Sequence, residues 1–210
     1  MRLASTTAAA LALCALVTFP VREDLYLTIA GTASDSSMLR ELVGAMASRG
    51  LLLLVALAAL VAVRSWQRER TGFWRLASAG IGVVGAYLLS EMIKLMVTEH
   101  RPCHVLEVGT VLPCPETSDW SWPSNHAVIA AAFVTACILA LPRTAWFAIP
   151  VAALIAYSRV AAGVHYVHDV ASGLALGTAA VIVAVAALQP VVNQLPTAWT
   201  TSKTVVHRRD

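Results

Sequence analysis

The stretch DVASGLALGTAAVIVAVAALQ, residues 169–189, decides the fold class, because no charged residue follows Asp169 within it. A helix needs roughly 20 mostly apolar residues to cross about 30 Å of hydrocarbon. The chain contains six such stretches, and we predict transmembrane helices at approximately Leu3–Val21, Leu42–Val63, Leu76–Val97, Pro123–Leu141, Thr144–Ala162 and Asp169–Gln189. The predicted fold is therefore an all-α bundle of six spans, in one integral-membrane domain over residues 1–210.

Two of these spans allow another interpretation. The uninterrupted apolar run of the second, Leu51–Val63, is too short alone, and extending it backward takes in Arg49. That arginine would have to snorkel to the surface or face the bundle. The first span could instead be a signal peptide, since Arg2 precedes its apolar run.

The composition of the whole chain agrees with a membrane protein. Of its 210 residues, 58% are hydrophobic and 13% are charged, whereas an ordinary soluble domain has about 45–50% and about 25%. A soluble enzyme, a disordered protein and a nucleic-acid binder are thereby excluded as default classes. The net charge of +3 is too small to indicate a polyanionic partner, and four cysteines are too few for a disulfide-dense scaffold.

Basic residues are distributed unevenly between the predicted loops. With six spans and both termini in the cytoplasm, the cytoplasmic segments hold nine of the 15 basic residues: Arg2, Arg64, Arg68, Arg70, Arg75, Arg143, Lys203, Arg208 and Arg209. They hold only Glu69 and Asp210 among the 12 acids, as the positive-inside rule expects. Five of the six histidines fall on or near the other side, so we predict an extracytoplasmic active site.

Polar side chains form three clusters at the ends of predicted helices, where ionisable groups are costly and indicate function. The first runs from Lys94 to Arg101-Pro102, the second is Pro123-Ser124-Asn125-His126, and the third joins Ser158-Arg159 to His165 and Asp169. The predicted topology puts all three at the same membrane face, although sequence alone does not show that they touch.

The first property of these clusters is positive charge. In a partly desolvated pocket, Lys94, Arg101 and Arg159 would repel one another unless an anion joined them. The arginine fork suits tetrahedral oxyanions, and lysine adds a compact charge. Ser124 and Asn125 lie where a helix N-terminus directs backbone N–H groups outward, which favours anions as well. We therefore predict a phosphate site, and the apolar surroundings predict a lipid substrate.

The second property is a pair of histidines. His165 and Asp169 are four residues apart and share a helix face if the sixth span begins there. The carboxylate can then hold one imidazole N–H and leave the other nitrogen free to attack. His126, from another helix, is available to protonate the leaving oxygen. These groups suffice for phosphoryl transfer without a metal, and we expect no cofactor.

Each signal also has a structural explanation. Lys94 or Arg101 alone is typical of an interfacial cation that snorkels. Ser124-Asn125 alone is typical of a helix cap, and a His–Asp pair at this spacing is more often a local hydrogen bond. Only the combination indicates catalysis.

Two other functional classes remain as alternatives. A metal site built from His100, His104 and His168 is disfavoured, because no cysteine or carboxylate stands at a recognisable ligand spacing. We interpret these three as surface or supporting residues. A non-catalytic anion transporter is disfavoured because no internal symmetry is visible.

The three clusters together resemble the type-2 phosphatidic acid phosphatase superfamily, whose pattern is K-x6-RP, then PSGH, then SR-x5-H-x3-D. Lys94 to Pro102 match the first part and Ser158 to Asp169 the third. The second part reads Pro123-Ser124-Asn125-His126, with asparagine in place of glycine. The resemblance runs from Lys94 to Asp169, and the predicted layout of spans extends it over most of the chain.

The resemblance implies roles for these residues. The family equivalents of His165, Asp169 and His126 are the nucleophile that becomes a phosphohistidine, the carboxylate that orients it and the proton donor. In the family, the phosphate is held by the equivalents of Lys94, Arg101, Ser124 and Arg159. A glycine amide usually contacts phosphate at the position of Asn125, which keeps the N–H but adds bulk.

The resemblance also suggests a class of substrate. Bacterial membrane members hydrolyse undecaprenyl, or another polyprenyl, diphosphate to the monophosphate, and we expect this reaction first. Phosphatidic acid, phosphatidylglycerol phosphate and a polyprenyl-phosphoryl sugar phosphate are alternative substrates. Transfer of the phosphoryl group to another lipid is an alternative reaction.

Cys103 and Cys114 lie in the predicted outer loop, Glu99–Trp122. The compartment outside the membrane is oxidising, where disulfides persist. We therefore predict a disulfide that fixes this loop beside the site.

Overall fold

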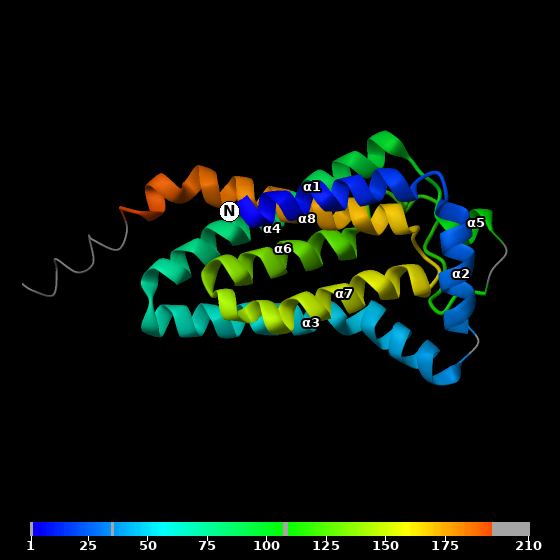
Figure 1. Ribbon diagram of the computed structural model, residues 1–210, viewed down its shortest axis with the longest axis horizontal. Coiled ribbons are helices and arrows are strands. Elements are labelled where there is room, and N and C mark those ends of the chain that lie inside the picture. Colours follow the sequence, from blue (N-terminus) through cyan, green and yellow to red (C-terminus); the bar gives the residue numbers. More distant parts are fainter. Residues whose placement is uncertain (1, 35, 107–108, 195–210) are drawn as a thin grey trace, which may run out of the picture.

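The computed structural model describes residues 2–34, 36–106 and 109–194, and within them it contains helices and no strand (Figure 1). The helices are α1 (Arg2–Thr18), α2 (Arg22–Ser34), α3 (Ser37–Arg68), α4 (Arg70–Val97), α5 (Pro102–Val105), α6 (Asn125–Ala140), the 3-10 helix η1 (Pro142–Thr144), α7 (Ala145–Ala161) and α8 (Val167–Val192). The prediction of an all-α fold is confirmed.

The number of membrane spans differs from the prediction. Among the described residues, four segments are long and apolar enough to cross a membrane: Ser37–Arg68, Arg70–Val105, Pro142–Ala161 and Val167–Val192. α1 and α2 form a fifth only if they count as one span, although they are bent by 97°. α6 is apolar but has 16 residues. Each predicted span therefore contains a helix, but the count of six spans is not confirmed.

The break between α1 and α2 has a local cause. Pro20 lacks an N–H and cannot continue the hydrogen-bond pattern of α1, which ends at Thr18. Glu23 and Asp24 then stand in the first turn of α2, where acids favour a helix start. α2 lies across one end of the bundle (Figure 1), and its buried Tyr26 donates a hydrogen bond to Gly163 O at 3.1 Å.

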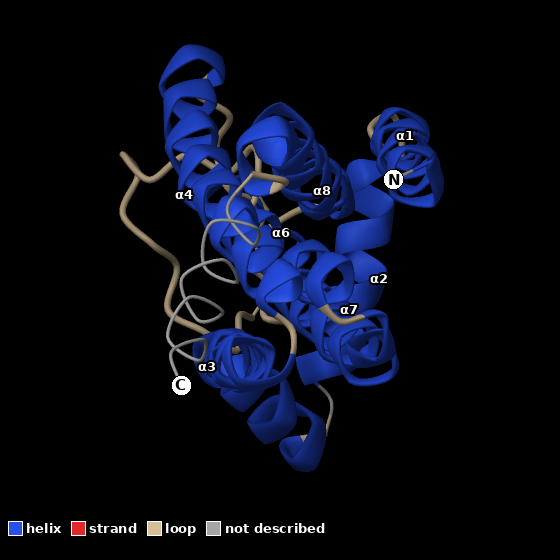
Figure 2. Cartoon of the chain, turned by 90° about the vertical axis from the view of Figure 1, so that its left-hand side faces the viewer, coloured by secondary structure: helices blue, strands red, loops and turns tan. Residues whose placement is uncertain are grey.

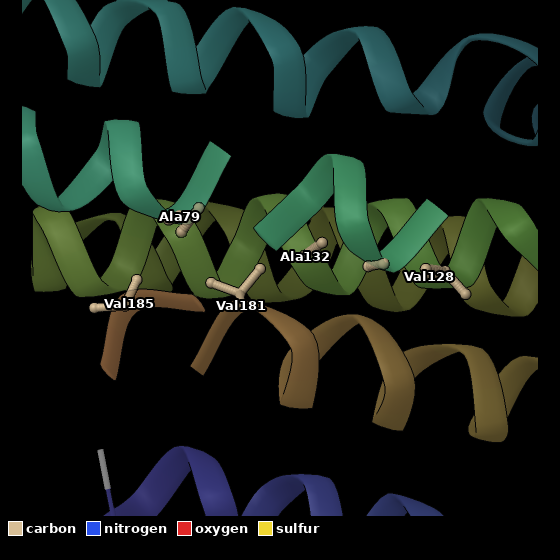
Figure 3. Packing of buried hydrophobic residues seen from close by; sticks show 7 residues of the cluster. Ala79, Val128, Ala132, Val181 and Val185 are labelled. Atoms are coloured by element: carbon tan, nitrogen blue, oxygen red, sulfur yellow. The ribbon is translucent and has the colours of Figure 1, made fainter. Parts of the chain in front are cut away.

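α6 lies in the middle of the bundle. It contacts α3, α4, α7 and α8, whereas α1 packs against the outer side of α8 (Figure 2). The contact among α4, α6 and α8 is made by small buried side chains (Figure 3): Ala79, Ala86, Val128, Ala132, Ala136, Val181 and Val185. Small residues let helix backbones approach closely, which is how helices associate in a membrane.

Two glycines of α8 set its distance from α6. A Cβ atom at Gly173 would lie 2.6 Å from Ser124 O, and one at Gly177 would collide with Val128 O. Only hydrogen fits in both places. This close approach holds the beginning of α6 beside the beginning of α8.

The two ends of the bundle differ in charge. The turn from α3 to α4 and the turn from α6 to α7 lie at one end, and they carry Arg64, Arg68, Arg70 and Arg143. The three predicted motif clusters lie at the other end. Lys203, Arg208 and Arg209 of the predicted cytoplasmic C-terminus lie outside the described residues.

Candidate active site

The three motif clusters meet at the end of the bundle that α2 covers. Arg101 caps α5, Ser124 caps α6, and His165 lies in the turn before α8. Arg101 Nη1 lies 3.0 Å from His165 Nε2, which joins the first cluster to the third. The backbone N–H of Ser124 donates to Asp169 O at 3.1 Å, which joins the second to the third.

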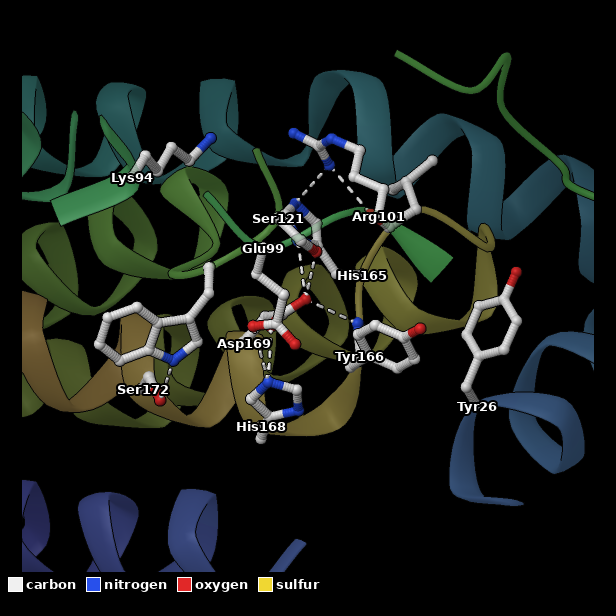
Figure 4. Close-up of polar contacts among 12 residues, drawn as sticks. Tyr26, Lys94, Glu99, Arg101, Ser121, His165, Tyr166, His168, Asp169 and Ser172 are labelled. Carbon is white, nitrogen blue, oxygen red and sulfur yellow. Dashed lines mark hydrogen bonds and ion pairs between the residues drawn. The ribbon is translucent and has the colours of Figure 1, made fainter. Parts of the chain in front are cut away.

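The arrangement around His165 fixes its tautomer. Its Nδ1 lies 3.3 Å from Asp169 Oδ2, and its Nε2 faces Arg101 (Figure 4). A guanidinium only donates hydrogen bonds, so Nε2 must accept and Nδ1 must carry the proton. The lone pair of Nε2 is therefore directed toward the cations.

The surroundings of His165 also determine its charge. Burial lowers the pKa of His165 well below the usual 6.5, and the positive charges of Arg101, Arg159, Lys94 and His126 lower it further. The imidazole is therefore neutral near pH 7.

Asp169 is held by groups that the sequence did not predict. Its Oδ2 accepts hydrogen bonds from Ser121 Oγ at 2.5 Å and from the backbone N–H of Tyr166 at 2.8 Å. Its Oδ1 lies 3.1 Å from Nε2 of His168, which also lies 3.2 Å from Glu99 Oε2. Asp169 thus lies between two imidazoles (Figure 4), and His168 is a buried supporting residue, not a surface one.

Three cations of the site are buried. Lys94, Arg101 and Arg159 are 5%, 3% and 6% exposed. Asp119 accepts from two of them: its Oδ1 lies 3.0 Å from Lys94 Nζ and 2.9 Å from Arg101 Nη2. Burial raises the pKa of Asp119, but Arg101 and Lys94 lower it more, so the net pKa lies below 3.8. The sequence did not predict Asp119 as a site residue.

Four buried side-chain atoms have no hydrogen-bond partner among the described protein atoms: Ser124 Oγ, Arg159 Nε, His168 Nδ1 and Asp169 Oδ1. The first two belong to residues that we predicted to hold phosphate. Arg159 uses another nitrogen, Nη1, to donate to Ala47 O at 3.1 Å. Both unpaired groups can donate, so they suit an acidic oxygen of a ligand. The backbone N–H of Ser124, by contrast, is already used by Asp169 O.

Asn125 is directed toward α4. Its Oδ1 accepts from Ser90 Oγ at 2.6 Å, and its Nδ2 donates to Glu91 Oε1 at 2.5 Å. The added bulk of asparagine is therefore accommodated by α4, and its backbone N–H, in the first turn of α6, is the group left for a ligand. Glu91 pairs with Asn125 while Lys94 pairs with Asp119.

One group at this end has donor atoms suited to a metal. Ligand atoms of Glu99, His168 and Asp169 lie within 4.8 Å of one another. In the present arrangement a single nitrogen, His168 Nε2, lies at hydrogen-bonding distance from both carboxylates. His168 Nε2 forms its hydrogen bond with Glu99, whereas Asp169 Oδ1 has no hydrogen-bond partner among the described atoms.

The predicted disulfide is formed in the structure. Cys103 and Cys114 are bonded across a sequence separation of 11 residues. The bond ties α5 to the segment that leads to Asp119 and Ser121. The backbone N–H of Ser121 also donates to Glu99 O at 2.8 Å, so this segment is held at both sides of the site.

Asp119 and Ser121 show what the sequence could have revealed. They belong to Asp119-Trp120-Ser121-Trp122, just before the second cluster. Loops on a rigid scaffold commonly carry function. A search for polar residues next to the motifs would have selected both, but no periodicity indicates their partners.

Comparisons with known proteins agree with this geometry. The sequence pattern described as the PAP2 superfamily matches residues 75–192. An undecaprenyl-diphosphatase of Sulfolobus acidocaldarius is 36% identical over 99 residues, which cover 47% of this chain and 48% of that protein. A decaprenylphosphoryl-5-phosphoribose phosphatase of Mycobacterium tuberculosis is 36% identical over 128 residues, which cover 60% of this chain and 64% of that protein. The chain thus spans between about half and just under two thirds of these relatives.

A solved structure shows the same fold. The transmembrane PAP2-type phosphatidylglycerolphosphate phosphatase of Bacillus subtilis has a TM-score of 0.65 and 19% identity, and the match covers 93% of this chain and 100% of that one. At this level of identity the likeness concerns the fold alone.

Proposed function

Because the chain belongs to the PAP2 superfamily, we propose that it is a membrane lipid phosphatase that works through a phosphohistidine at His165. The observation that carries this proposal is the charge of the site. Three buried cations, Lys94, Arg101 and Arg159, have one half-exposed carboxylate among them. A buried charge is costly unless it is paired.

A phosphate group would remove this imbalance. Among the described residues, Asp119 is the only carboxylate within ion-pair distance of these cations, while Asp169 faces the imidazoles, so a phosphate dianion would bring the negative charge that the cations lack. The unpaired Ser124 Oγ and Arg159 Nε would donate to its oxygens, together with the N–H of Asn125. The neutral His165 would then face the phosphorus with its Nε2 lone pair.

In the first chemical step, Nε2 of His165 forms a bond to phosphorus while the bond from phosphorus to the lipid oxygen breaks. His126 gives its proton to the departing oxygen. Asp169 keeps the proton on Nδ1 and stabilises the positive charge that develops on the ring. The three cations stabilise the charge on the phosphoryl oxygens, which provides much of the rate enhancement in phosphoryl transfer.

In the second step, His126 takes a proton from water, whose oxygen attacks phosphorus. The bond between phosphorus and Nε2 breaks, and inorganic phosphate leaves. His165 returns to its neutral state. The residues named here supply the nucleophile, the acid and the base, so the proposed reaction needs no metal ion.

The substrate that we propose first is a polyprenyl diphosphate such as undecaprenyl diphosphate, which would be hydrolysed to the monophosphate. The relative named undecaprenyl-diphosphatase supports it. A polyprenyl-phosphoryl sugar phosphate is the second candidate, because the relative named for such a lipid matches 128 residues rather than 99. We place the site on the extracytoplasmic side and both termini in the cytoplasm, since arginines collect at the opposite end of the bundle.

The test is release of phosphate by the purified chain from a panel of lipids. The panel contains undecaprenyl diphosphate, a polyprenyl-phosphoryl pentose phosphate, phosphatidic acid and phosphatidylglycerol phosphate, each with and without EDTA. We expect the highest kcat/KM with the diphosphate and no effect of EDTA. Equal rates on all four lipids would refute the substrate preference.

Two histidine variants provide the controls. His165→Ala should release no phosphate above background. His100→Ala removes an exposed imidazole that lies beside Trp120, and it should retain the parental rate. If His165→Ala hydrolysed any of these lipids at the parental rate, the proposed function would be wrong.

A further inference from the structure

Asp119 lies where the proposed function needs a phosphate oxygen. A single atom, Asp119 Oδ1, forms ion pairs with both Lys94 Nζ at 3.0 Å and Arg101 Nη2 at 2.9 Å. Arg101 Nε also donates to the backbone oxygen of Asp119 at 2.7 Å. One carboxylate thus satisfies the two cations in the way that an acidic oxygen of a substrate would.

Resting on the function proposed above, we propose that Asp119 is a specificity-determining residue that competes with phosphate for Lys94 and Arg101. In the free protein its carboxylate occupies both cations. A phosphate group binds them only when this carboxylate moves aside.

The surroundings of Asp119 permit this exchange. Its side chain is 49% exposed, so the displaced carboxylate can be hydrated, whereas the cations that it contacts are buried. On its buried side Arg101 keeps its contact to Val164 O at 2.9 Å, while His165 Nε2 is released to face the phosphorus atom. The cation pair therefore stays in place while the anion changes.

Charge also favours the exchange in one direction. Asp119 brings one negative charge and one bridging oxygen to the pair, while a phosphate dianion brings two charges and further oxygens. These oxygens can also reach the unpaired donors Ser124 Oγ and Arg159 Nε. Asp119 remains ionised through the neutral range, because its pKa is held below 3.8, and so it competes at every working pH.

The cost of displacing Asp119 is the same for every phosphate group, but ligands differ in the contacts that offset it. For free phosphate, only its contacts with the cations and with the donors Ser124 Oγ and Arg159 Nε offset the displacement of Asp119. A lipid phosphate adds the burial of its chain. Asp119 therefore makes the site bind inorganic phosphate, the product, more weakly than its cations alone would, and it favours product release.

The test compares Asp119→Asn with Glu116→Gln in the full-length purified chain. Glu116 is an exposed acid three residues earlier in the same loop, and its replacement removes the same charge without touching Lys94 or Arg101. The measurement is the inhibition constant of inorganic phosphate against lipid hydrolysis. We expect Asp119→Asn to lower this constant about tenfold, and Glu116→Gln to change it less than about twofold.

A third variant separates the charge of Asp119 from its shape. Asp119→Glu keeps a carboxylate near the cations and should keep the weak binding of phosphate, whereas Asp119→Ser should bind it as tightly as Asp119→Asn. If Asp119→Asn does not fold, the comparison of Asp119→Ser with Asp119→Glu tests the same point. An unchanged or raised inhibition constant in folded Asp119→Asn or Asp119→Ser would overturn the inference.

The proposed function can fail separately. If the parental chain hydrolyses lipid and is inhibited by phosphate, but removal of the Asp119 carboxylate changes nothing, only the competition is wrong. If the parental chain hydrolyses none of the lipids, the proposed function itself fails, and the competition fails with it.

Discussion

At the scale of single residues, the direction of the His165 lone pair depends on two neighbours with opposite hydrogen-bonding roles. An ionised Asp169 can only accept a hydrogen bond, and Arg101 can only donate one. Nδ1 therefore carries the proton, and Nε2 has the free lone pair that the proposed function assigns to the attack on phosphorus. Both neighbours therefore favour the same tautomer.

Replacing Asp169 by Asn tests this arrangement. Asp169 Oδ2 accepts from Tyr166 N and also faces His165 Nδ1, so an amide oxygen in this place keeps both contacts but loses the negative charge that stabilises the protonated ring. We expect kcat to fall by about 10²- to 10⁴-fold, by analogy with other histidines oriented by a carboxylate. The measurement is single-turnover hydrolysis of the preferred lipid.

Ser121→Ala is the matched control for that variant. It removes one hydrogen bond to Asp169 Oδ2 and leaves the carboxylate in place. We expect a loss of about tenfold or less. A smaller loss in Asp169→Asn than in Ser121→Ala would contradict the role given to Asp169.

The lowered pKa of His165 predicts the pH dependence of the reaction. In the proposed mechanism the neutral form of His165 is the nucleophile, so its protonation sets the acid limb of activity, and loss of the His126 proton sets the alkaline limb. Because burial and the nearby positive charges lower the pKa of His165 well below 6.5, the acid limb of kcat/KM should lie well below that pH. Arg159→Gln removes one of these charges and should move the limb to higher pH.

The profile of kcat/KM against pH in both proteins checks this prediction. An acid limb of the parental chain at or above pH 6.5 would contradict the lowered pKa of His165. A limb that does not move in Arg159→Gln would show that the charge of Arg159 is not felt at His165.

Residues with a fixed spacing could be predicted from the sequence. Lys94 and Arg101, or His165 and Asp169, stand at intervals along the chain that by themselves have a chemical meaning. Asp119 and Ser121 could not be assigned in this way. Their partners come from three other segments of the chain, and only the folded loop brings them together.

At the scale of the elements, the approach of α6 to α8 sets the site geometry. Gly177 lies against Val128 O, one turn of α6 away from Ser124 and His126. Gly177→Ala should force the two helices apart and cost about 1–3 kcal/mol in stability. It should also reduce activity, because Ser124 and His126 would move away from His165.

Gly80→Ala is the control for this prediction. A Cβ atom at Gly80 meets no atom within 4 Å, and alanine favours a helix more than glycine does. The thermal midpoint in detergent and the rate of phosphate release should be unchanged or slightly raised. Equal midpoints for Gly177→Ala and the parental chain would show that the interface tolerates the methyl group.

The first predicted span shows what apolar length can and cannot reveal. The sequence predicts one helix over Leu3–Val21, and α1 covers most of it. The direction of the chain after Pro20 is set by packing: Tyr26 of α2 reaches Gly163 O, on a turn that is distant in sequence. A hydropathy pattern contains no information about this contact, so it does not predict α2 or the 97° bend.

At the scale of the whole molecule, the distribution of charge predicts the orientation in the membrane. The site with its loops lies at one end, and Arg64, Arg68, Arg70 and Arg143 lie at the other. In a Cys14→Ser background, a membrane-impermeant maleimide added to intact cells should label Thr117→Cys and not Arg143→Cys. Labelling of Arg143→Cys instead would reverse the proposed orientation.

The helical bundle and the meeting of the three motif clusters at one of its ends followed from the sequence, because apolar length and chain direction determine them. The number of spans did not. α6 has 16 residues and lies in the centre of the bundle, so its burial by protein removes the need for a full membrane length. A helix buried by protein and a helix exposed to lipid show the same pattern of apolar residues.

The most direct test of the central claim, that buried cations and two imidazoles act on one phosphorus atom, is a rapid-quench experiment with lipid labelled at its terminal phosphate. We predict an acid-labile, base-stable phosphoenzyme in the parental chain, with the label on His165 and none in His165→Ala. Full turnover without a labelled protein, or a label on any residue other than His165, would contradict the account.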